Sequence, residues 1–126
     1  MVADKRILVV DDDTDLLTAL ELLLPYSGYQ VMTSQTADKI FSQIEEFKPN
    51  IVLLDIHIGA VDGRQICRAI RSTEETCSLP IIMLSADDDI YNTISSVGAN
   101  DVVSKPFNFN NLTDRIDRQI QQTLMP

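Results

Sequence analysis

The stretch Ile7–Leu17, "ILVVDDDTDLL", is the most informative segment of this sequence for its fold. Four apolar residues lead directly into three consecutive aspartates, and leucines at helical spacing begin almost at once. A continuous apolar run is typical of a strand that helices cover on both faces. Carboxylates held close together raise each other's pKa and oppose folding unless a cation lies between them. The stretch therefore predicts a buried strand that ends in a cation-binding turn before a helix.

The rest of the chain repeats this alternation of strand and helix. Ile51–Leu54 and Ile81–Leu84 are continuous apolar runs that predict central strands, whereas Gln30–Thr33 and Asp101–Ser104 predict weaker strands of the edge type. Apolar residues at helical spacing predict five helices. The apolar residues of each predicted helix, in chain order, are Leu16, Leu20, Leu23 and Leu24; Ile40, Phe41, Ile44 and Phe47; Ile66, Ala69 and Ile70; Ile90, Ile94 and Val97; and Leu112, Ile116, Ile120 and Leu124. In 126 residues this alternation predicts a single α/β domain, a doubly wound parallel sheet with helices on both faces.

The composition is that of a globular protein with a strong excess of acid. Hydrophobic residues make up 44% and charged residues 23%, and the formal net charge is -9 with a sequence pI near 4.3. A negative field repels phosphate backbones, which disfavours direct binding of nucleic acid. The apolar run Ile7–Val10 after Lys5 and Arg6 is too short for a signal peptide or a membrane span. Cys67 and Cys77 lack metal-ligand or redox spacing, so we expect reduced thiols and a cytoplasmic protein.

Polar side chains stand at the carboxyl ends of four predicted strands. They are Asp11 and Asp12 after the first strand, Asp55 in the third, Ser85 in the fourth and Lys105 in the fifth. In doubly wound sheets ligands bind beyond these ends, so we expect the five groups to share one crevice. Carboxylate oxygens with room for water are the ligands that Mg²⁺ accepts. A metal ion with a lysine and a further carboxylate suits the handling of a phosphoryl group.

The segments around these residues resemble a known family. "ILVVDDD", "VLLDIHIGAVDG", "IIMLSA" and "VSKPF" are similar, in order and spacing, to the signature segments of response-regulator receiver domains. Each segment alone is a weak signal, but the four together are highly specific, and the resemblance covers about residues 5 to 123. It implies a flavodoxin-like sheet of five parallel strands in the order 2-1-3-4-5. It also implies that residues 1–126 form a single receiver domain with no output domain.

The resemblance implies a role for each residue of the predicted crevice. Asp55 would be the phospho-acceptor, and Asp11 and Asp12 would be the acidic pair that organises Mg²⁺. Asp55 and the main-chain carbonyl of His57 would complete the protein ligands of the metal. Ser85 would hydrogen-bond one phosphoryl oxygen, and Lys105 would pair with another.

The family also implies partners and an output. A sensor histidine kinase or a phosphotransfer protein would donate the phosphoryl group, and the domain would catalyse only its own phosphorylation and dephosphorylation. A downstream protein would then recognise the face formed by the fourth helix, the fifth strand and the fifth helix. No direct contact with nucleic acid or membrane is expected.

The chain departs from the family pattern at two positions. The family usually has proline four residues after the acceptor, where this chain has Gly59, which predicts a looser loop after the third strand. It usually has Tyr or Phe three residues before the lysine, where this chain has Val102. Because valine has no ring to swing inward, we expect activation mainly in the loop after the fourth strand and the start of the fourth helix.

Several acidic residues and the single histidine have simpler interpretations. Asp13 is predicted to be a helix N-cap or first-turn acid rather than a metal ligand, and Asp87–Asp89 are interpreted in the same way for the fourth helix. The side chain of His57 is predicted to be solvated rather than a phosphohistidine. The resemblance to receiver domains implies that His57 and Asp87 flank the route of water to the acyl phosphate, so we predict that this pair modulates hydrolysis.

Two other functions stay open at this point. A small Mg²⁺-dependent phosphatase with an aspartyl-phosphate intermediate would use Asp11 as nucleophile and Asp13 as acid. Against it, Asp15 stands where that superfamily usually has Thr or Val, and the chain has no insertion to cap a substrate. A protein-binding module that works without phosphorylation would not need the complete set of groups around Asp55.

Overall fold

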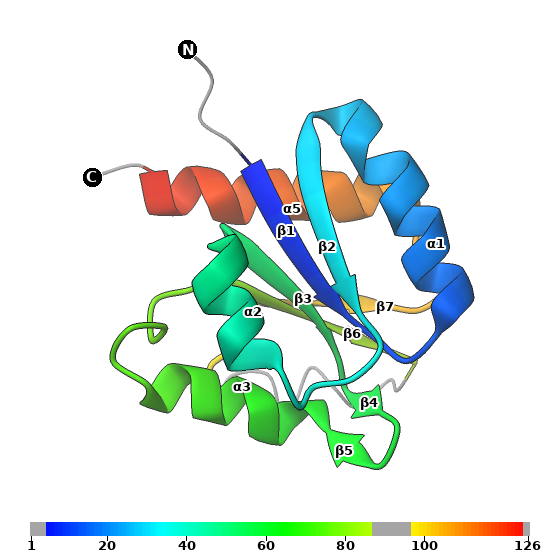
Figure 1. Ribbon diagram of the computed structural model, residues 1–126. Helices are drawn as coiled ribbons and strands as arrows, with labels where there is room; N and C mark the ends of the chain where they lie inside the picture. Colours follow the sequence, from blue (N-terminus) through cyan, green and yellow to red (C-terminus); the bar gives the residue numbers. More distant parts are fainter. Residues whose placement is uncertain (1–4, 87–96, 125–126) are drawn as a thin grey trace.

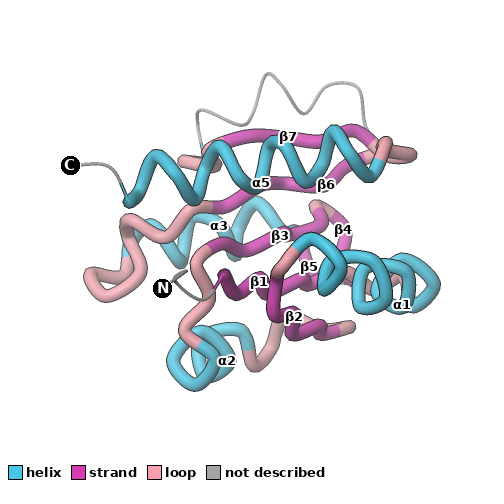
Figure 2. Tube along the Cα trace, turned by 90° about the horizontal axis from the view of Figure 1, so that it is seen from above, coloured by secondary structure: helices cyan, strands magenta, loops and turns pink. Residues whose placement is uncertain are grey.

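A parallel sheet of five strands forms the centre of the computed structural model, which describes residues 5–86 and 97–124 (Figure 1). The strands are β1 (Lys5–Val10), β2 (Tyr29–Ser34), β3 (Ile51–Asp55), β6 (Ile81–Ser85) and β7 (Asp101–Ser104). They lie in the order β2-β1-β3-β6-β7, and Figure 2 shows them side by side in this order. The predicted topology is therefore confirmed, and the two weaker apolar runs are the two edge strands.

Helices cover both faces of the sheet and bury an apolar core on each. The helices are α1 (Thr14–Leu23), α2 (Ile40–Phe47), α3 (Gly63–Ser72) and α5 (Phe109–Leu124), with a 3₁₀ turn, η1, at Leu24–Ser27. Apolar residues of α2 and α3 form one core with the sheet, and those of α1 and α5 form the other. No helix in the described part of the chain is both long and apolar enough to cross a membrane.

Strand β1 shows why its apolar run is continuous. Successive side chains of a strand point to opposite faces of a sheet. Leu8 and Val10 belong to the core under α2 and α3, while Ile7 and Val9 belong to the core under α1 and α5. All four residues are fully buried. A strand between two helical layers therefore has no polar face.

The ends of α1 are set by local hydrogen bonds. Asp13 is the N-cap, as predicted, and its side chain accepts hydrogen bonds from the main-chain N–H groups of Asp15 and Leu16 at 3.1 and 3.3 Å. After α1 the chain forms the 3₁₀ turn η1, which is capped by Gly28. The φ of Gly28 is 91°, in the left-handed region that glycine accepts without strain. The turn directs the chain into β2.

A two-stranded antiparallel hairpin follows β3 and was not predicted from the sequence (Figure 1). Its strands are β4 (His57–Ile58) and β5 (Val61–Asp62). Gly63 then begins α3, and its N–H donates to the carbonyl of Ile56 at 2.6 Å. A Cβ atom at Gly63 would overlap the main-chain carbonyl of Asp55. The hairpin can therefore return the chain against the end of β3 only because this residue is glycine.

The predicted fourth helix lies mostly outside the described residues, including Ile90 and Ile94. Val97 is helical and buried in the core under α2 and α3. Gly98 follows with a φ of 83°, so the predicted stop of this helix at Gly98 is confirmed.

Candidate functional site

The carboxyl ends of the central strands bring the predicted polar groups to one edge of the sheet. The register pairs Val10 of β1 with Leu54 of β3, so Asp11 and Asp55 follow side by side. Ser85 ends β6 and is buried, and its carbonyl accepts a hydrogen bond from the N–H of Lys105 at 2.7 Å. The predicted crevice is thus assembled from strands β1, β3, β6 and β7.

Lys105 lies between two buried carboxylates. Its Nζ is 2.7 Å from Oδ2 of Asp11 and 3.3 Å from Oδ2 of Asp55. Asp11 is fully buried and Asp55 is 6% exposed, so neither charge is well hydrated. The other oxygen of Asp11 accepts the N–H of Asp13 at 2.9 Å. The ammonium therefore balances charge that would otherwise oppose folding.

Burial and neighbouring charges shift the pKa values of Asp55 and Lys105. Burial raises the pKa of Asp55 above its usual value and the charge of Asp11 raises it further, while Lys105 acts in the opposite direction. Burial alone would lower the pKa of Lys105, but its hydrogen bond to Asp11 and the charges of Asp11 and Asp55 outweigh burial and raise that pKa. Lys105 is therefore an ammonium ion at neutral pH.

Asp11, Asp12 and Asp55 form an acidic cluster that fits a divalent cation. One carboxylate oxygen from each lies within 4.8 Å of the others, whereas Asp13 stays outside the cluster as the helix cap. Asp12 is exposed, which leaves the cluster open to water on one side. Mg²⁺ takes few carboxylate ligands and keeps several waters. The donor set therefore has the chemistry that Mg²⁺ requires, and the ammonium of Lys105 contacts two of its three carboxylates, Asp11 and Asp55.

The hairpin after β3 is fastened to this cluster. The N–H of Gly59 donates to Oδ2 of Asp12 at 2.9 Å. Gly59 has a φ of 61°, and a proline at this position would have neither the N–H nor the required φ. The sequence predicted that glycine in place of proline would loosen the loop; in the structure the glycine supplies a donor that holds it.

His57 and Asp62 lie opposite each other on the hairpin. His57 is exposed, as predicted for its side chain, and it pairs with Asp62 in the antiparallel register. The side chain of Asp62 also caps α3 and binds Arg64, whose hydrogen bonds hold the pKa of Asp62 below its usual value. Asp87, the predicted partner of His57, lies outside the described residues.

Val102 occupies the position at which an aromatic residue was expected from the family. It is 1% exposed and lies in the core under α2 and α3, beside Met83 of β6. The side chain therefore fills the core and has no polar tip at the surface. The sequence patterns above did not single out Asp62 and Gly63, although an aspartate directly before an amphipathic segment is a recognisable helix N-cap.

Comparison with known proteins identifies the family to which this fold belongs. The family model of the response regulator receiver domain matches residues 7–117. The chain belongs to this family. It is 32% identical over 115 residues to the alkaline phosphatase synthesis transcriptional regulatory protein PhoP of Bacillus subtilis, with 90% of this chain and 47% of that protein covered.

Further relatives agree with the receiver assignment. The chain is 34% identical over 120 residues to the response regulator MprA of Mycolicibacterium vanbaalenii, covering 94% of this chain and 51% of that protein. It therefore spans about half the length of these curated relatives. A CheY-like receiver domain protein of Methanospirillum hungatei has a crystal structure with a TM-score of 0.85 and 27% identity, covering 95% of this chain and 96% of that one.

Membership of the family gives the general function. Receiver domains of two-component response regulators are phosphorylation-dependent switches, are generally Mg²⁺-dependent, and interact with histidine kinases or phosphotransfer proteins.

Proposed function

We propose that Asp55 of this receiver domain accepts a phosphoryl group from a histidine kinase or phosphotransfer protein. The observation that carries the proposal is the position of Lys105, whose Nζ lies 3.3 Å from Asp55 and 2.7 Å from Asp11. Asp55 is also the carboxylate at which the acidic cluster, the lysine and the end of β3 meet. The site thus combines a nucleophile with fixed positive charge at its side.

The chemistry follows from these groups. One oxygen of the ionised Asp55 forms a bond to phosphorus while the bond from phosphorus to the imidazole nitrogen of the donor breaks, which leaves an acyl phosphate. Lys105 offers its ammonium to the phosphoryl oxygens, and the hydroxyl of Ser85 offers a hydrogen bond. Burial raises the pKa of Asp55 and the charge of Lys105 acts against that rise, so the lysine favours the ionised form of the nucleophile.

Mg²⁺ would be held by Asp11, Asp12 and Asp55, with the main-chain carbonyl of His57 as a further ligand. When bound, it supplies charge that offsets the negative charge of the transferring group. Gly59 has a supporting role, because its N–H holds one oxygen of Asp12 and leaves the other for the ion. In this proposal the chain catalyses only its own phosphorylation and dephosphorylation.

The switch would begin at Lys105 and Ser85. A phosphoryl group on Asp55 adds acceptor oxygens, and the ammonium that now contacts Asp11 would turn toward them. Lys105 follows β7 directly, and its N–H binds the carbonyl of Ser85, so the change would reach the ends of β6 and β7 through the main chain. A downstream partner would recognise the surface of β7, α5 and the predicted fourth helix.

The phosphatase alternative is disfavoured by the environment of its nucleophile. Asp11 is fully buried, and its two oxygens are engaged by Lys105 and by the N–H of Asp13. Asp13, the proposed acid, is occupied as the cap of α1. Asp11 is thus not presented to an external substrate, and Asp13, although exposed, already serves as a helix cap.

Acetyl phosphate with Mg²⁺ provides the direct test. Trapping and mapping of the modified residue should identify Asp55 alone, and Asp55→Asn should abolish labelling. EDTA should suppress it in the unaltered protein. Labelling of Asp11 would favour the phosphatase, and labelling that survives in Asp55→Asn would refute the proposal.

A further inference from the structure

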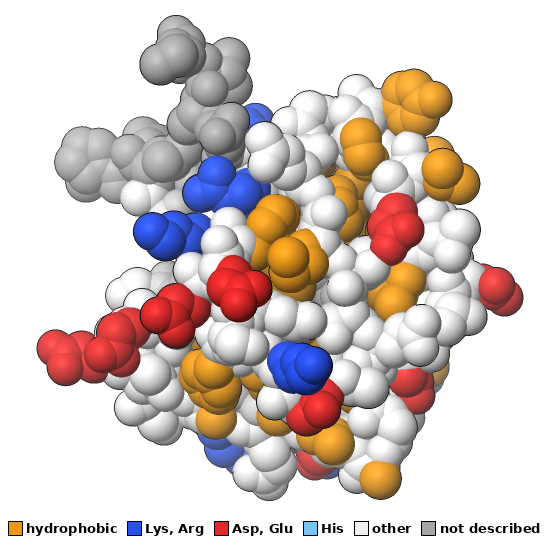
Figure 3. All heavy atoms as spheres, viewed as in Figure 1, with side chains coloured by type: hydrophobic (Ala, Val, Ile, Leu, Met, Phe, Trp, Pro, Cys, Tyr) orange, Lys and Arg blue, Asp and Glu red, His pale blue; other side chains and the backbone are white. Residues whose placement is uncertain are grey.

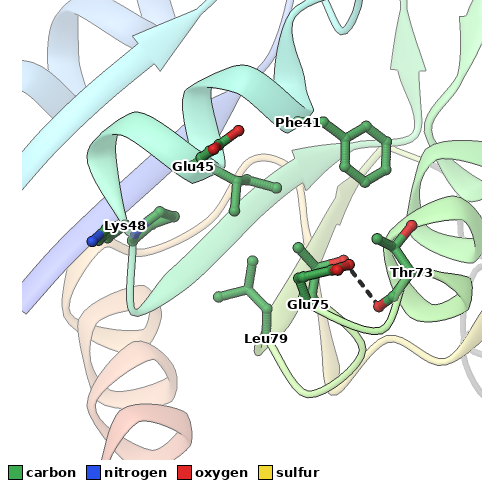
Figure 4. Close-up of a pocket in the computed structure, with 9 residues that line it drawn as sticks. Phe41, Glu45, Lys48, Thr73, Glu75 and Leu79 are labelled. Atoms are coloured by element: carbon green, nitrogen blue, oxygen red, sulfur yellow. Dashed lines mark hydrogen bonds between the residues drawn. The ribbon is translucent and has the colours of Figure 1, made fainter.

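A second hollow of the molecule lies far from Asp55. A pocket of about 570 Å³ is formed by α2, by Pro49 after it, and by the loop between α3 and β6; we call it the α2–α3 pocket (Figure 4). Pro49 precedes β3 and Leu79 precedes β6, so the pocket lies at the ends of these strands opposite to Asp55 and Ser85. Five residues of strand span roughly 15 Å. A molecule in this pocket would therefore leave the phosphorylation site free.

The floor of the α2–α3 pocket is apolar. Phe41 and Ile44 line it from α2, and Pro49 and Leu79 line it from the connections that lead into the sheet. Figure 4 shows Phe41 and Leu79 on different sides of the hollow, both directed into it. Phe41 is 40% exposed, which is unusual for a large aromatic side chain in a core-facing helix. The exposed ring offers a contact surface to an apolar group from outside.

The rim of the pocket is acidic. Glu45 and Glu75 line it, and Glu46 and Glu74, which are also exposed, are their neighbours in the chain. Lys48 is the one cation among the lining residues. Figure 3 shows acidic side chains gathered on the side of the molecule where α2 and the α3–β6 loop lie. The local excess of negative charge favours a cationic ligand.

The loop that forms one wall is held in place by hydrogen bonds. The hydroxyl of Thr76 donates to the carbonyl of Ile70 at 2.7 Å in a buried bond, and the N–H of Leu79 donates to the carbonyl of Thr76 at 3.0 Å. Arg71 of α3 donates to the carbonyl of Leu79 at 2.6 Å. A wall fixed in this way is preorganised, so little conformational entropy is lost when a ligand binds.

We propose that the α2–α3 pocket binds a basic segment of a partner protein. An apolar side chain of the segment lies against Phe41 and Leu79, and lysines or arginines beside it face Glu45 and Glu75. A protein segment fits better than an enclosed cofactor, because the ring of Phe41 is open to solvent and a ligand seated on it keeps one side exposed. The proposal goes beyond phosphorylation and does not rest on Asp55 being the acceptor.

The probe for the test is a short synthetic peptide in which leucines and lysines recur at helical spacing, labelled with a fluorophore. Its binding to the unphosphorylated protein is followed by fluorescence anisotropy, and the site is mapped by amide chemical shifts. The same peptide with glutamate in place of every lysine serves as the ligand control. We expect saturable binding of the basic peptide, with shifts centred on α2 and the α3–β6 loop, and no binding of the acidic one.

Two double variants separate the pocket from general attraction to an acidic protein. Glu45→Gln with Glu75→Gln removes two lining charges, and Glu46→Gln with Glu74→Gln removes two charges from the same elements outside the lining. The first pair should weaken binding about tenfold and the second less than about threefold.

Phe41→Ser gives an independent check of the apolar floor. Because the ring is partly exposed, the variant should fold and yet lose at least about fivefold in affinity. Equal losses in the two double variants, shifts centred on another face, or absence of saturable binding would each overturn the proposal.

Discussion

Replacing Lys105 by methionine tests the electrostatic design of the site most directly. The substitution keeps most of the apolar stem and removes the ammonium that lies 2.7 Å from Asp11 and 3.3 Å from Asp55. Asp11 is fully buried and Asp55 nearly so, so each carboxylate would keep its desolvation cost after the loss of its cation. The free energy of unfolding should therefore fall.

The size of the loss follows from the burial of the partners. Removal of one member of a buried ion pair costs about 3–5 kcal/mol, whereas an exposed pair contributes less than about 1 kcal/mol. The side chain of Lys105 is 20% exposed and the cluster is open to water at Asp12, so we expect the lower limit, about 3 kcal/mol. Lys5→Met is the matched control, because Lys5 lies 3.8 Å from Asp117 in a partly exposed pair.

Urea denaturation at neutral pH, followed by far-UV circular dichroism without Mg²⁺, gives the required free energies. Lys105→Met should lose about 3 kcal/mol and Lys5→Met less than about 1 kcal/mol. In an Asp11→Asn background, the loss from Lys105→Met should shrink to about 1 kcal/mol, because one buried charge is gone. A loss in the unaltered background no larger than that of Lys5→Met would show that Lys105 is an ordinary surface lysine.

Three further outcomes are expected. Mg²⁺ should raise the melting temperature, with about 2.7 kcal/mol of stabilisation at a hundredfold excess over its Kd, and calorimetry should show this gain lost in Asp12→Asn. Asp55→Asn should be more stable than the unaltered protein at neutral pH. The pKa of Asp55 is raised in the folded state, so the cost of its charge is present above that pKa and is relieved as the pH falls through it. Urea denaturation should therefore show the free energies of unfolding of the two proteins converging in acid. Replacement of both His57 and Asp87 by alanine should change the dephosphorylation rate several-fold, on the order of 1 kcal/mol in barrier, with Mg²⁺ affinity unchanged; an unaltered phosphoprotein lifetime would exclude a role for this pair.

The order of the elements and the edge of the sheet that carries the site were both predictable from the sequence. Continuous apolar runs such as Ile51–Leu54 are typical of strands buried on both faces, and their alternation with helical patterns predicted a doubly wound sheet without any knowledge of contacts. The N-cap at Asp13 was also predictable, because the hydrogen bonds of a cap involve residues two and three positions away. Asp11, Asp55 and Lys105 could be assigned to one crevice because parallel strands end at the same edge.

Which of these groups contact one another depends on the packing of the folded chain. Lys105 and Asp11 are 94 positions apart, and their contact depends on the register of β1, β3, β6 and β7 together. The bond from Gly59 to Asp12 likewise joins two loops, 47 positions apart, whose conformations no local pattern specifies. The α2–α3 pocket exists because the loop after α3 stands against α2, and its lining comes from residues that sequence periodicity assigned to separate elements. Local hydrogen bonds and periodic burial depend on residues that are close in sequence, so they can be predicted from it. Contacts between distant side chains arise only when the packed sheet brings the ends of its strands and helices to fixed positions.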